Sequence, residues 1–298
     1  MTVFQIKFWV PLANFETDSC PIKLGTNIII DKTSKHEKSI LSDLKKKWSN
    51  ITFSDFILRL SIEKSEPEAE IGLYLREARI ELEKAITIFR LFKKELIGFN
   101  VIIQRYSDIE NYAYSANALL HYMLWAVPDS EYFRSKYRIK RNEIMEFTNF
   151  FSEYHLPSFE KMDLSVNYFN KSYIEPYTPR DSFLDIMICL ENLFLKGSRQ
   201  ELSYKLSMRV AHILGCNVKE RKQLFQTTKK AYGYRSSIVH SGEPGKLNEE
   251  FLLNMRDIAR ISLRYFILNI GFWSESELDF LILNNTFFPN HHLYSDAR

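Results

Sequence analysis

The spacing of apolar and polar positions changes along the chain and separates two regions. Toward the N-terminus, apolar residues form short runs or alternate with polar residues, which is typical of strands. Two stretches instead show the three-to-four-residue spacing of amphipathic helices, one short and one longer. We therefore expect strands at 3–10, 27–30, 53–62 and 99–103, and helices at 35–48 and 67–96.

From about residue 129 onward the pattern is helical almost throughout. Four segments resemble helix starts, in which a capping side chain satisfies backbone N–H groups that the first turn leaves unpaired. They lie at 178–181, 198–201, 217–220 and 274–277. The expected fold is mainly α, with a helical bundle at 151–298 after a mixed α/β N-terminal domain of unknown role at 1–150.

The segment 179–195 is apolar on nearly every side, which predicts a central helix, and it contains one carboxylate, Glu191. A buried carboxylate without a counter-charge costs several kcal/mol, so Glu191 should meet a cation or reach water. Arg209, on the next predicted helix, is the first candidate for a structural ion pair. Arg235 is the second candidate.

Composition excludes several classes of protein. Of 298 residues, 45% are hydrophobic and 26% charged, and the net charge of +3 permits nucleic-acid binding without requiring it. The three cysteines form no CxxC pair, so we expect neither a disulfide framework nor a metal site, and no cofactor. No apolar run approaches the length of a membrane span, and the first residues do not resemble a secretory signal. We expect a cytoplasmic protein with no membrane association.

The strongest chemical signal combines Arg235 and His240, five positions apart and followed by Gly242. On a continuing helix these side chains would diverge by about 140°. The glycines and the proline after His240 predict that the helix stops there, which would let the imidazole turn back toward the arginine. A permanent cation beside a group that titrates near neutral pH suits phosphodiester chemistry.

Three segments together resemble the ApeA-type HEPN domain. They lie at 190–194, 201–211 and 232–242, and the third contains the R-x4-H motif of Arg235 and His240. The resemblance covers roughly 159–272. It implies that the helical bundle at 151–298 is HEPN-like and forms a homodimer, with the two R-x4-H segments meeting in one cleft. One departure is Ser236, because the residue after the arginine is often a larger polar group in this family.

What the resemblance implies is a metal-independent endoribonuclease with Arg235 and His240 as the catalytic pair. The 2′-hydroxyl would attack the neighbouring phosphorus, giving 2′,3′-cyclic phosphate and 5′-hydroxyl ends. His240 would move a proton and Arg235 would stabilise the developing charge. Members of the family act in anti-phage defence, abortive infection or toxin–antitoxin systems, so an antitoxin or defence partner is a further expectation.

Four residues near the motif are candidates for binding RNA: Tyr232 by stacking on a base, Ser236 on phosphate, and Lys229 and Lys230 along the backbone. Core packing for Tyr232 and a solvated face for the lysines are the alternatives. Two other functions also stay open. The protein could be a non-catalytic nucleic-acid-binding or regulatory HEPN protein, or an assembly partner of another enzyme.

Overall fold

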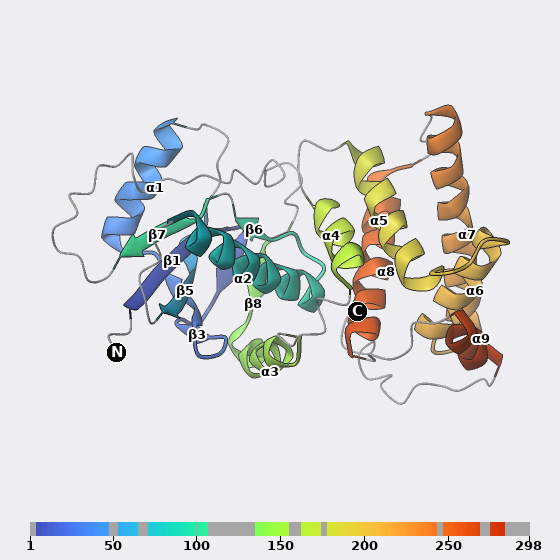
Figure 1. Cartoon of the computed structure of the whole chain (residues 1–298), viewed down its shortest axis with the longest axis horizontal. Coiled ribbons are helices and arrows are strands. Elements are labelled where there is room, and N and C mark those ends of the chain that lie inside the picture. The colour runs from blue at the N-terminus through green and yellow to red at the C-terminus, as the bar shows by residue number, and fades with distance from the viewer. Residues whose placement is uncertain are drawn as a thin grey trace. The chain divides into compact units, whose positions relative to one another are not determined.

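The structure is a computed structural model that describes residues 4–47, 53–64, 71–99, 101–106, 135–154, 162–173, 178–242, 247–268 and 275–283. The chain divides into two compact units, Met1–His155 and Leu156–Arg298 (Figure 1). The predicted division at residue 150 falls inside α3 (Ile144–Tyr154), and this helix belongs to the first unit. Each unit is described by itself.

An antiparallel sheet organises the first unit. Its strands follow the order β3-β4-β5-β1-β6, and β7 also pairs with β1. A separate parallel pair joins β2 to β8. The strands are β1 (Phe4–Ala13), β2 (Phe15–Thr17), β3 (Ile22–Lys23), β4 (Ile28–Lys32), β5 (Phe56–Lys64), β6 (Gly98–Phe99), β7 (Ile103–Tyr106) and β8 (Tyr137–Ile139).

The strand and helix predictions for this unit are confirmed with two exceptions. The strand expected at 99–103 is two strands, β6 and β7, which pair with different parts of β1. The expectation of helix from residue 129 is wrong at β8, because its short apolar segment pairs with β2, a segment far away in sequence. A pairing between distant segments leaves no local periodic signal.

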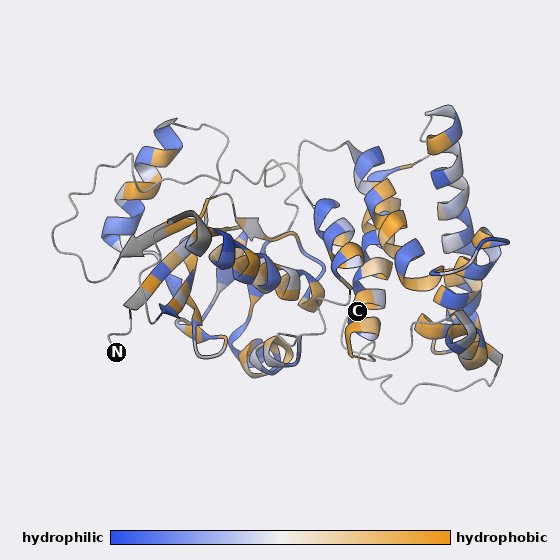
Figure 2. Cartoon of the chain, in the orientation of Figure 1, coloured by the Kyte–Doolittle hydropathy of each residue, from blue (hydrophilic) through white to orange (hydrophobic). Residues whose placement is uncertain are grey.

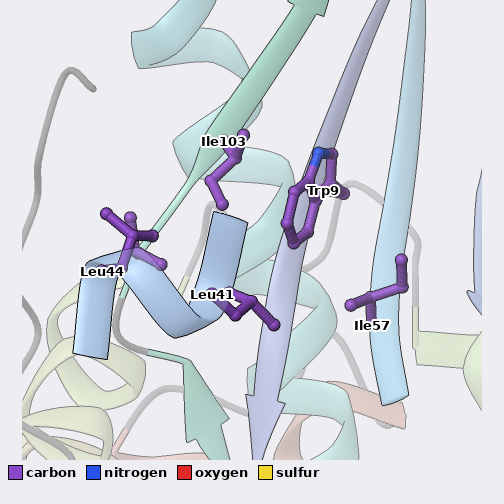
Figure 3. Packing of buried hydrophobic residues seen from close by; sticks show 6 residues of the cluster. Trp9, Leu41, Leu44, Ile57 and Ile103 are labelled. Carbon is purple, nitrogen blue, oxygen red and sulfur yellow. The ribbon is translucent and has the colours of Figure 1, made fainter. Parts of the chain in front are cut away.

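Helices pack on both faces of the sheet. The first is α1 (Lys35–Lys47), and Leu41 and Leu44 of this helix lie over Trp9, Ile57 and Ile103 of the sheet (Figure 3). Because side chains alternate along a strand, Phe8, Val10, Leu58 and Leu60 point to the opposite face, and all four are buried. There α2 (Ile71–Phe92) covers the sheet (Figure 1). A short 3₁₀ turn, η2 (Arg141–Glu143), leads into α3.

Every regular element among the described residues of the second unit is a helix. Its helices are α4 (Asp163–Lys171), α5 (Pro179–Phe194), α6 (Leu202–Leu214), α7 (Val218–Ser241), α8 (Glu249–Leu268) and α9 (Glu275–Leu283). The predicted central helix is α5, which contacts α4, α6, α7 and α8. Its buried side chains include Phe183, Ile186, Leu190 and Phe194. The structure is thus mainly helical with an N-terminal α/β region, as predicted.

Two of the four predicted caps are confirmed. Thr178 and Asp181 form the reciprocal capping box at the start of α5, and Asn217 accepts from the backbone N–H of Glu220 at the start of α7. The cap at 198–201 is wrong: α6 begins after Glu201, which has φ 53°, and the Ser198 hydroxyl accepts from a buried arginine instead. The segment 274–277 begins outside the described residues.

No helix among the described residues combines the length and the apolar character needed to span a bilayer.

Candidate active site

The R-x4-H segment lies on α7, which is one uninterrupted helix of 24 residues. It ends as the glycine predicts: Gly242 takes φ 73°, and its N–H donates to the carbonyl of Ile238 at 2.9 Å. A left-handed residue after the last turn is the usual way to close a helix, and glycine adopts it without steric cost. Because the helix continues through Ser241, His240 lies within the last helical turn.

Arg235 pairs with Glu191 of α5. The Nε atom of Arg235 lies 3.0 Å from Oε1 of Glu191, and Nη2 donates to Oε2 at 3.4 Å. Oε1 is buried and accepts no hydrogen bond among the described residues, so its contact with Nε is electrostatic and poorly aligned. Both side chains are partly buried. The predicted partner of Glu191, Arg209, is therefore wrong, and the second candidate is the one observed.

Arg209 is fully buried and has a different task. It donates to the carbonyl oxygen of Phe194 and to the hydroxyl of Ser198, and it forms an ion pair with Asp279 of α9 at 2.8 Å. The carbonyls at the end of a helix lack partners within that helix, so the guanidinium satisfies one of them at the end of α5. Arg209 therefore reaches the C-terminal end of α5, whereas Glu191 faces α7.

Tyr232 completes a small charged cluster with this pair. Its ring centroid lies 5.9 Å from the guanidinium carbon of Arg235, one helical turn away. Burial raises the pKa of the Glu191 carboxyl, and the charge and hydrogen bond of Arg235 act in the opposite direction. Burial also raises the pKa of the Tyr232 hydroxyl, with a further contribution from the charge of Glu191. The tyrosine thus belongs to the surroundings of Arg235.

His240 does not join this cluster. It is exposed, and within the described part of the chain it has no hydrogen bond or ion pair. Five residues of helix separate it from Arg235 by about 7.5 Å along the axis and about 140° around it. The helix stops near His240 as expected, but His240 is still part of its last turn, and among the described residues it makes no hydrogen bond or ion pair with Arg235 that would show the imidazole turned back toward it. Arg235 and His240 of one chain therefore leave α7 on different sides of the helix.

His240 instead shares a face of α7 with two of the predicted RNA-binding residues. Lys229, Ser236 and His240 are spaced by seven and four residues, which places them along one side of a helix. Gly233 lies between them, and apart from its chain neighbours and the adjoining helix backbone no described atom lies within 4 Å of where its Cβ would be. Lys229, Gly233 and His240 are exposed, and Ser236 is half-buried. Among the described residues, little covers this outer face of α7, and Figure 2 shows α7 mostly in hydrophilic and neutral colours.

Lys230 lies on the side of α7 that meets α8, and each of the two lysines adjoins aromatic rings. The Nζ atom of Lys229 lies 5.9 Å from the ring of Phe225, and Nζ of Lys230 lies 5.5 Å from Tyr234 and 5.2 Å from Phe251. Sequence analysis missed these rings. The four-residue spacing from each lysine to the ring on α7 could have indicated the local contacts. The position of Phe251 on α8 carries no such signal.

Comparisons with protein-family models, with curated proteins and with solved structures found no match. Among the described residues, no group of three or more histidine, cysteine, aspartate or glutamate side chains is arranged to hold a metal ion.

Proposed function

We propose that the protein is a HEPN-type endoribonuclease that cuts RNA without a metal ion, and that its active site is completed by a second copy of the chain. The cut is made by the 2′-hydroxyl of the RNA and leaves 2′,3′-cyclic phosphate and 5′-hydroxyl ends. A role in anti-phage defence or as a toxin, in the cytoplasm, and with an antitoxin or defence partner, belongs to the same proposal.

The observation that carries the proposal is the arrangement of α7. Arg235 is held beside Glu191 and Tyr232, so its guanidinium has a defined position at the surface of the bundle. His240 is exposed in the last turn of the same helix, next to an open basic face. A fixed cation and a free imidazole on one helix are the two groups that the reaction needs.

Two copies are needed because Arg235 and His240 of one chain diverge. In a pair related by twofold symmetry, His240 of each copy can approach Arg235 of the other, and both composite sites form together. In each composite site the single His240 takes the proton of the 2′-hydroxyl or gives one to the leaving 5′-oxygen, and water exchanges the other proton. Arg235 stabilises the charge that develops on the non-bridging oxygens.

Cleavage of an end-labelled, unstructured RNA in EDTA tests the proposal. His240→Ala and Arg235→Ala should each lower the rate by roughly 10²–10⁴-fold, the usual contribution of a positioned proton carrier or charge stabiliser. Mixing the two variants should restore part of the activity, because a mixed dimer contains one site with both groups intact. His36→Ala, which removes an exposed histidine of the first unit, serves as the matched control and should cut at the normal rate.

Full activity of His240→Ala would contradict the assignment of the histidine. An inactive mixture of two individually folded variants would contradict the composite site. Analysis of the product ends gives an independent check, since a 3′-hydroxyl product is incompatible with attack by the 2′-hydroxyl.

One observation favours the alternative of a non-catalytic nucleic-acid-binding or regulatory protein. The charge of Arg235 is already engaged by Glu191, and His240 does not reach it within the chain. A protein of this kind binds RNA through the basic face of α7 and does not cut it. Measurable RNA affinity with no cleavage in either EDTA or Mg²⁺ would support this second function.

A further inference from the structure

We propose that the outer face of α7 and its two flanks bind single-stranded RNA, with unpaired bases stacking on aromatic rings beside Lys229 and Lys230. The inference rests on the proposed function and extends it to the class of substrate. It concerns residues that the R-x4-H motif does not include.

The first flank is formed with α6. The ring of Tyr204 on α6 meets the ring of Phe225 edge to face, at 6.0 Å between centroids, and the ammonium of Lys229 lies over Phe225. Tyr204 is 53% exposed, although tyrosine is a residue that a bundle readily buries. An exposed ring held at a fixed angle beside a cation offers a flat surface to a base and a positive charge to its phosphate.

The second flank is formed with α8. Tyr234 and Phe251 meet at 5.4 Å between ring centroids, and Lys230 lies within 5.5 Å of both centroids. Tyr234 and Phe251 are half-buried, whereas Lys230 is exposed. Because more of these two rings is covered than of Tyr204, we expect the second flank to contribute less stacking than the first.

The outer face of α7, between the two flanks, carries small side chains and positive charge. Gly233 has open space on its outer side, and Ser237 beside it is small and exposed. Neither Lys229 nor Lys230 forms an ion pair with any described carboxylate, so both ammonium groups are available to phosphate. Two more exposed lysines, Lys219 and Lys222, continue the charge toward the start of α7.

This combination favours unpaired RNA over other polyanions. Lysines alone would attract any anionic chain, including a duplex or an acidic peptide. Aromatic rings add affinity only where bases present a free face, which a duplex withholds. His240 lies on the same outer face as Lys229, so a strand bound there passes the proposed catalytic residue.

The test measures binding separately from cutting. The 298-residue His240→Ala protein is titrated against a fluorescent, unstructured oligoribonucleotide, with the same strand in a duplex and polyglutamate as competitors. Adding Tyr204→Ala should weaken binding by roughly fivefold to tenfold, the lower part of the range for losing one stacked base. Tyr204→Phe should bind normally because it keeps the ring. Phe280→Ala on α9 removes another exposed ring, 65% exposed, and should have no effect.

Equal affinities for the Tyr204→Ala and Phe280→Ala proteins would overturn the stacking site and leave the proposed function standing. Competition by polyglutamate or duplex as strong as that by the single strand would overturn the preference for unpaired bases. If stacking is confirmed but the wild-type protein cuts no RNA, the nuclease proposal fails and the binding site remains. Absence of RNA binding by every protein would overturn both.

Discussion

Helices α7 and α8 use the same class of residue in opposite ways. Twelve of the 20 residues of α8 are buried, among them Arg256, Arg260 and Arg264. Only Thr228, Ala231 and Ile238 are buried among the 24 residues of α7, and its lysines are exposed. In α8, therefore, cations lie inside the bundle, whereas in α7 most of them remain at the surface.

The difference separates structural from functional charge. Arg256 donates to the carbonyl and hydroxyl of Ser172 at the end of α4, and its guanidinium stacks on Tyr173 at 4.5 Å. Burial lowers its pKa, which means that burying the charged guanidinium costs free energy that the rest of the fold must offset. The exposed lysines of α7 satisfy no buried group of this kind. Charged side chains that make no such contact are the better candidates for binding a ligand.

The largest effect should come from removing a buried cation of α8. Arg256→Ala leaves the carbonyl of Ser172, the residue after α4, without its donor and opens a cavity beside Tyr173, so we expect a loss of about 3 kcal/mol in the free energy of unfolding. Lys222→Ala on α7 is the matched control and should change it by less than about 0.5 kcal/mol. Urea denaturation measures both. Similar losses in the two variants would contradict the contrast between the helices.

A smaller effect concerns where α7 ends, since its end places His240. Gly242→Ala puts a side chain at φ 73° and should cost about 1 kcal/mol of stability. Gly233→Ala, in the middle of the same helix and with open space around it, should instead stabilise the protein by about 0.5–1 kcal/mol. Thermal denaturation of the pair checks the opposite signs. A gain in stability in Gly242→Ala would show that the helix continues beyond Ser241.

The smallest effect concerns Asp185, a carboxylate of α5. This helix packs against α8. Burial raises the pKa of Asp185 to about 6, although the charge of Lys171 opposes the rise, and its Oδ2 has no hydrogen-bond partner among the described residues. The folded state therefore favours the protonated form. The stability that this group contributes is full below about pH 4, near the pKa in the unfolded chain, and is lost as the pH rises through about 6.

Asp185→Asn removes this dependence. At pH 7.5 the variant should be more stable than the wild type by up to about 1 kcal/mol, a value reduced because the group is partly exposed. At pH 4 the two proteins should unfold at nearly the same temperature. Thermal denaturation across pH 4–8 compares them. A gap that stays constant with pH would mean that Asp185 ionises normally in the fold.

Local patterns predicted the elements well where the signal is contained in neighbouring residues. The cap at Thr178, the cap at Asn217 and the closing glycine at Gly242 each act within one helical turn. They were predicted for that reason. The cap at Ser198 has the same kind of sequence and failed, because a buried arginine from the next helix takes its hydroxyl.

The candidate site shows the same limit. The motif identifies Arg235 and His240, and the need of Glu191 for a cation follows from its apolar surroundings. The choice between Arg209 and Arg235 does not, since both lie on later helices at unknown distances. Whether His240 lies inside or beyond the last turn of α7 depends on one or two residues at the helix end, a difference that sequence patterns do not resolve.

By itself, the sequence determined the mainly helical character, the strands β1, β4 and β5 and the helices α1 and α2 of the first unit, the central place of α5 and the residues of the R-x4-H motif. These follow from periodicity and capping, which act over a few residues. The tertiary structure alone decided that Glu191 holds Arg235, that Arg209 ties α5 to α9, and that Lys229 and Lys230 adjoin aromatic rings. These contacts depend on how helices pack, because packing brings together side chains that are distant in sequence.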